Sequence, residues 1–71
     1  MTPIVYRLVI EGELSERAAR AFDGMTVSPN TDHTVLVGRV GDQAHLYELL
    51  RRVGKLGLTL RSAKPVESDE G

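Results

Sequence analysis

The spacing of apolar residues changes along this chain, and each change marks a new structural element. Between residues 4 and 11 the side chains alternate with a period of two, which predicts a half-buried strand. We assign the more apolar set to the core: Tyr6, Leu8 and Ile10. The alternate set faces the other side of the strand: Val5, Arg7 and Val9.

Two helices are predicted by their first and last residues. Ser15 suits an N-cap, because its hydroxyl can accept a hydrogen bond from an unpaired backbone N–H. A short helix of about two to three turns should follow and stop near Gly24. Asp42 should cap a second helix that ends at Gly57. Its apolar residues recur at spacings of three and four: Ala44, Leu46, Leu49, Leu50, Val53 and Leu56.

Three further strands complete the pattern. Residues 25–28 and 34–40 are rich in strand-forming types, and the turn cluster 29–32 between them predicts a hairpin. Pro29 cannot donate a ladder hydrogen bond, which favours an edge position for the first of these strands. The last strand should cover residues 58–64 and end at Pro65.

The predicted order is β-α-β-β-α-β. This order indicates an α+β domain of the ferredoxin-like type, with an antiparallel four-stranded sheet and two helices on one face. We expect one domain over residues 1–65, followed by a short acidic tail, 66–71, that is disordered.

The uncovered sheet face is the predicted place for function. Strict alternation places nine residues there: Val5, Arg7, Val9, Val35, Val37, Arg39, Thr59, Arg61 and Ala63. Exposed apolar patches often mark interfaces, so we interpret the valines Val5, Val9, Val35 and Val37 as a partner or self-association surface. Arginine binds carboxylate and phosphate well, so Arg7, Arg39 and Arg61 are candidate anion ligands. The alternative is an ordinary exposed face whose charges discourage aggregation.

Size and composition favour self-association and narrow the choice of partners. A chain of 71 residues buries only about 60% of its unfolded surface, and the absence of cysteine excludes disulfides. Without the three acids of the tail, seven acids face nine bases (10 − 3 = 7), a balance of +2 that is too mild to indicate nucleic acid. The aromatic platform of RNA-binding sheets is also missing. We see no signal peptide and no apolar stretch long enough to span a bilayer, and expect a cytoplasmic protein.

Motifs for catalysis or cofactor binding are absent. No phosphate-binding glycine motif occurs. The adjacent pair Asp32 and His33 is too small for a metal site, and no histidine stands at a recognisable spacing from a serine. We therefore predict no catalytic residue, metal or cofactor. The leading hypothesis is a non-enzymatic protein-interaction or regulatory module that acts as a homodimer.

The chain resembles a family of short, uncharacterised bacterial proteins. The resemblance rests on Asp42-Gln43-Ala44, the leucine-rich helix after it, and the run Leu56-Gly57-Leu58 with Leu60 and Ser62. Phe22-Asp23-Gly24 and the strand Val35-Leu36-x-Gly38 are also similar. The resemblance implies no particular activity.

ACT domains share the predicted element order. They bind amino acids at a dimer interface, beside a glycine that follows the first strand. Gly12 occupies roughly that place, although the Pro-Gly of the common ACT pattern is replaced by Glu13, Leu14 and Ser15. This likeness implies a second hypothesis, a small-ligand site for an amino acid or anion near Gly12 and Glu13.

Overall fold

A computed structural model describes residues 4–66 of the chain. Its six elements follow the predicted order: β1 (Ile4–Glu11), α1 (Glu16–Arg20), β2 (Thr26–Pro29), β3 (His33–Val40), α2 (Gln43–Lys55) and β4 (Leu60–Pro65). Of the predicted acidic tail, residues 67–71 lie outside the described residues.

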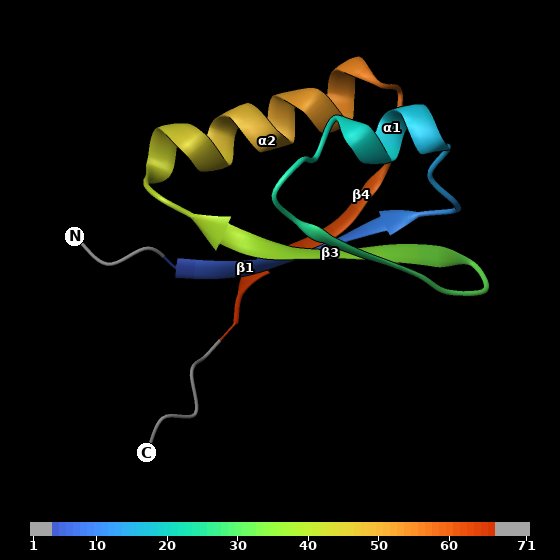
Figure 1. Cartoon of the computed structure of the whole chain (residues 1–71), viewed down its shortest axis with the longest axis horizontal. Coiled ribbons are helices and arrows are strands. Elements are labelled where there is room, and N and C mark those ends of the chain that lie inside the picture. Colours follow the sequence, from blue (N-terminus) through green and yellow to red (C-terminus); the bar gives the residue numbers. More distant parts are fainter. Residues whose placement is uncertain (1–3, 67–71) are drawn as a thin grey trace.

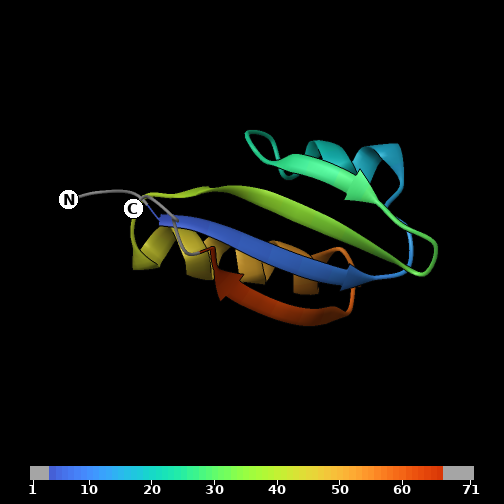
Figure 2. The ribbon, with the colours of Figure 1, turned by 90° about the horizontal axis from the view of Figure 1, so that it is seen from below.

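The sheet and helices form two layers. The four strands lie in the order β2-β3-β1-β4, and every neighbouring pair is antiparallel. Both helices lie against the same face of the sheet (Figure 1), and the view from below shows the strands with no helix in front of them (Figure 2). The predicted α+β fold of ferredoxin-like order is therefore confirmed.

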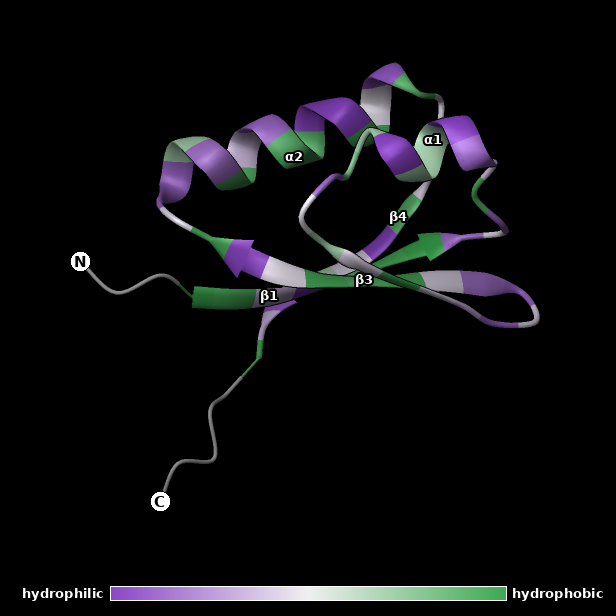
Figure 3. Cartoon of the chain, viewed as in Figure 1, coloured by the Kyte–Doolittle hydropathy of each residue, from purple (hydrophilic) through white to green (hydrophobic). Residues whose placement is uncertain are grey.

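The core lies between the sheet and the helices. Leu8 and Leu36 are paired across β1 and β3, and both are fully buried. The buried cluster also contains Ile10, Phe22, Val40, Leu49 and Val53. Tyr6 is partly buried and packs against this cluster, so the predicted core face of β1 is confirmed. The apolar stripe of α2 is directed toward the sheet (Figure 3).

Local capping signals correctly predicted where both helices begin. The Ser15 side chain accepts a hydrogen bond from the Ala18 N–H, and the Asp42 carboxylate accepts one from the His45 N–H. The first helix is shorter than predicted, with five residues. Its end tightens because the amides of Ala21 and Phe22 bond to carbonyls three residues back, as in a 3₁₀ turn.

One strand departs from the predicted alternation. The β1–β4 register shifts between Val9 and Ile10, where Val9 pairs with Ser62 and Ile10 pairs with Leu60. Arg61 is the extra residue of this bulge, and an extra residue reverses the faces of all side chains beyond it. Ala63 therefore packs on the core, and its predicted place on the open face was wrong. Thr59 lies before the strand begins.

Two glycines allow a matched stability prediction. A Cβ on Gly38 would lie 2.7 Å from the Met25 Cγ and 3.1 Å from its Cα. We expect Gly38→Ala to lower the free energy of unfolding by about 1–3 kcal/mol through overpacking. A Cβ on Gly54 in α2 would meet open space, so Gly54→Ala should raise stability by about 1 kcal/mol. Urea denaturation of both variants measures these changes, and a stabilising Gly38→Ala would contradict the close packing against Met25.

Candidate interaction surface

The face of the sheet turned away from the helices carries a mixed set of side chains. We call it the open face, and strand register defines its members: Thr26 and Ser28 of β2; His33, Val35, Val37 and Arg39 of β3; Val5, Arg7, Val9 and Glu11 of β1; and Ser62 and Lys64 of β4. The structure therefore brings together the four predicted interface valines and two of the three predicted arginines.

The valines occupy the two central strands of the open face. Val9 lies directly opposite Val35, and Val37 follows two residues along β3. Val35 also lies opposite Ser28 and is only 7% exposed, although no helix covers it. Val5, Val9 and Val37 remain half-buried. These four side chains form a continuous apolar belt, which we call the valine belt.

Three cations gather at one end of the open face. Arg7 lies directly opposite Lys64 across the β1–β4 pair. Arg39 lies opposite Val5 on the other side of β1, which makes it a diagonal neighbour of Arg7. Such neighbours have Cα atoms about 5–8 Å apart, within reach of one multivalent anion. We call Arg7, Arg39 and Lys64 the basic end.

Sequence reasoning missed Lys64 as a member of the basic end. Strict alternation from Leu58 and Leu60 assigned Ser62 and Lys64 to the core side. The change from leucine to polar residues at these positions, with Ala63 between them, was the signal of a reversed face.

The other end of the open face carries charges of both signs. Glu11 lies opposite His33, whose Nδ1 is 2.8 Å from the Asp32 carboxylate. Arg61 lies close enough for its charge to act on Asp32. The structure therefore separates Arg61 from Arg7 and Arg39. We call Glu11, Asp32, His33 and Arg61 the mixed end.

The contact between Asp32 and His33 predicts how the pKa of Asp32 responds to a substitution of His33. The hydrogen bond with His33 lowers the pKa of Asp32 below its ordinary value, and the charges of His33 and Arg61 act in the same direction. Because the pKa is lower in the folded state than in the unfolded state, the ionised Asp32 stabilises the fold at pH values above its unfolded-state pKa. This stabilisation is lost as the pH falls through the pKa of the folded state. His33→Asn should therefore raise the Asp32 pKa measured by carboxyl NMR titration. An unchanged midpoint would contradict the assigned hydrogen bond.

In the Gly12 loop, which was predicted to bind a ligand, the backbone N–H and carbonyl of Gly12 already form hydrogen bonds within the protein. Gly12 has φ +80°, a left-handed conformation that favours glycine. Its N–H donates to the Asp32 carbonyl at 2.9 Å, and its carbonyl accepts from the Thr34 hydroxyl at 2.9 Å. Glu13 follows and is exposed. Gly12 is five residues from Arg7, or about 16 Å along an extended strand, so the two candidate ligand groups are separate.

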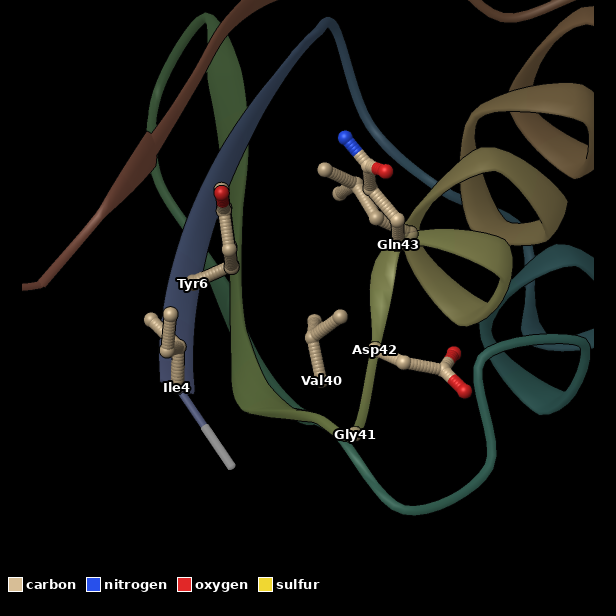
Figure 4. A pocket seen from close by; sticks show the side chains of 7 residues that line it. Ile4, Tyr6, Val40, Gly41, Asp42 and Gln43 are labelled. Carbon is tan, nitrogen blue, oxygen red and sulfur yellow. The ribbon is translucent and has the colours of Figure 1, made fainter. Parts of the chain in front are cut away.

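A hollow of about 460 Å³ lies on the opposite side of the sheet, where α2 begins. Its walls are mainly apolar and include Ile4, Val40 and Leu46, with Tyr6 beside them (Figure 4). The Asp42 carboxylate points away from Ile4 and Tyr6 in this view and is already used as the helix cap. Within residues 4–66, no buried side-chain polar atom is left without a hydrogen-bond partner. None of these atoms therefore requires a ligand as its partner.

The described residues form neither a metal-binding cluster nor a membrane-spanning helix. Residues 4–66 bring no three histidine or carboxylate side chains together in a metal-binding arrangement. The helices formed by the same residues are too short and too polar for one of them to cross a membrane.

The fold and its surface define a small α+β domain whose uncovered sheet face combines valines with charges. The chain belongs to the family described as Domain of unknown function (DUF8691), whose model matches residues 5–64. The match covers both helices and all four strands apart from Ile4 at the start of β1 and Pro65 at the end of β4. No curated protein and no solved structure matches the chain.

Proposed function

We propose that this protein is a non-enzymatic interaction module that forms a homodimer through its open face. The observation that carries the proposal is the valine belt on the two central strands, which overlaps the basic end and adjoins the mixed end. Valine side chains on two neighbouring strands can pack against a second sheet at the spacing of about 10 Å found in β-sandwiches. A second copy of this chain provides a matching belt.

Charge supports one orientation of the two copies. The basic end carries three cations, whereas the mixed end carries two carboxylates and one arginine, a balance of 1 − 2 = −1. A two-fold axis that lies midway between the two sheets, parallel to them and perpendicular to the strands, exchanges the two ends. In this isologous arrangement the basic end of each protomer lies over the mixed end of the other, so charges of opposite sign meet.

The sheet edges are less suited to self-association. The β2 edge is four residues long and contains Pro29, and the β4 edge is bulged at Arg61. Short edge strands, prolines, charges and bulges all discourage edge pairing. These features favour the face over the edges as the contact between protomers.

The size of the face predicts a dimer of modest affinity. The four strands have 8, 4, 8 and 6 residues, and at about 3.3 Å per residue and about 4.8 Å between strands they span roughly 400 Å². Stable interfaces bury about 800 Å² per partner. Sedimentation velocity from low to high micromolar protein should therefore show a monomer that converts to a dimer. A strict monomer at high micromolar concentration would remove the basis of the proposal.

A second candidate function is anion binding, favoured by the register that brings Arg7, Arg39 and Lys64 together. As in the hypothesis suggested by the likeness to ACT domains, the ligand is a small molecule. Its proposed binding site is the basic end and not the Gly12 loop. A ligand that binds only the native state raises the melting temperature. Phosphate, citrate and amino acids at millimolar concentration test this candidate by thermal shift, with Arg39→Gln as the variant that should lose the response.

A further inference from the structure

We propose that the basic end of the open face binds the acidic segment 67–71 of the same chain, and that this contact competes with a second copy for that end. The competition rests on the homodimer proposed above, whereas the binding does not. Three observations favour this segment as the group that binds there: the charge of the basic end, the place where the described chain leaves the sheet, and the composition of the segment that follows.

The cations of the basic end have no anionic partner among the described residues. The ion pair found within residues 4–66 is that of His33 with Asp32, at the mixed end. Arg7 and Lys64 lie directly opposite each other, and like charges in this position repel. An anion placed between them removes the repulsion.

The described chain leaves the sheet beside these cations. The Val66 N–H donates to the Val5 carbonyl at 2.7 Å, and Val5 is the residue opposite Arg39. Val66 also follows Lys64 by two positions. Arg39 is two strands away from β4, or about 10 Å. Five residues span up to about 17 Å, so segment 67–71 can reach all three cations.

The composition of the segment matches the basic end. Glu67, Asp69 and Glu70 supply three carboxylates for three cations. A guanidinium group binds a carboxylate through two parallel hydrogen bonds, which suits Arg7 and Arg39. Covalent attachment by a short chain gives these carboxylates an effective concentration in the millimolar range.

The contact has a consequence for the dimer. In the two-fold arrangement, the basic end receives Glu11 and Asp32 of the second copy. Carboxylates of the protomer's own segment occupy the same cations and repel the incoming ones. The segment therefore lowers the affinity of the dimer, and neutralising its charge should strengthen self-association.

The test compares two triple variants with equal changes in net charge. In the first, Glu67→Gln, Asp69→Asn and Glu70→Gln neutralise the segment. In the control, Glu16→Gln, Asp23→Asn and Glu48→Gln neutralise exposed acids elsewhere. At low micromolar concentration, only the first should shift the NMR signals of the Arg7 and Arg39 side-chain N–H groups and of the Lys64 amide. Molar salt should produce the same shifts in the unmodified chain.

The NMR signals test the binding of the segment, and the dimer dissociation constant tests its competition with a second copy. Unchanged signals at the basic end, or signals that respond to added inorganic phosphate but not to the segment, would overturn the binding. If binding is seen, the dimer dissociation constant from sedimentation should fall about three- to tenfold in the first variant. A constant equal to that of the control would overturn the competition. Absence of any dimer would instead refute the homodimer proposal while leaving the binding result valid.

Discussion

Replacing Phe22 with alanine is expected to lower the free energy of unfolding by about 3–5 kcal/mol. Phe22 is 1% exposed and belongs to the central buried cluster. It follows a helix of only five residues, in which Ala18 is the buried side chain. Phe22 is therefore the largest buried side chain that the α1 segment contributes to the core.

This loss is comparable with the whole stability of the fold. A domain of 71 residues has roughly 4–11 kcal/mol in total, so the variant should be partly unfolded at room temperature. Urea denaturation followed by circular dichroism measures the change. Tyr47→Ala is the matched control, because Tyr47 is 57% exposed on α2 and its removal should cost no more than about 0.5 kcal/mol. Equal losses in the two variants would contradict the core described above.

Placing an aspartate at Val37 is expected to weaken the dimer about 100-fold. Val37 lies in the valine belt, between Thr26 and Arg7 on the neighbouring strands. In the monomer the new carboxylate can reach water and Arg7, so the fold should persist. In a face-to-face dimer it is buried against the partner's valines, which costs about 3 kcal/mol, or a factor of about 100.

Sedimentation velocity at several concentrations measures this effect. Tyr47→Asp adds the same charge to the exposed side of α2 and should leave the dissociation constant unchanged. If the two variants form dimers as well as the unmodified chain does, the contact between protomers lies elsewhere, on a strand edge or on the helices.

Sequence reasoning succeeded where the signal is local. Ser15 and Asp42 begin their helices because each side chain bonds to an amide three residues ahead, which depends on nothing distant. The alternation in β1 is equally local, and its single period predicted both the core face and the open face. The order of the strands then followed from the sequence of elements, because connections in such folds are short and right-handed.

The composition of the candidate site was less predictable, because it depends on one extra residue. The bulge at Arg61 reverses β4, adds Lys64 to the basic end and leaves Arg61 near Asp32. Whether a strand accommodates such a residue depends on the neighbouring strand, about 50 positions away in the chain. The hollow beside Ile4, Tyr6 and Leu46 was missed for the same reason, because it arises from how α2 crosses the sheet.

The proposed interface would bring the valines of two copies into contact, and such contacts can be measured. A sample that mixes ¹³C-labelled and unlabelled chains, at a concentration where dimers form, allows NOEs between protomers to be selected. The proposed interface predicts such NOEs among the methyl groups of Val5, Val9, Val35 and Val37. NOEs between protomers that arise only from α2 or from the outer edge of β4, with none from these valines, would contradict it.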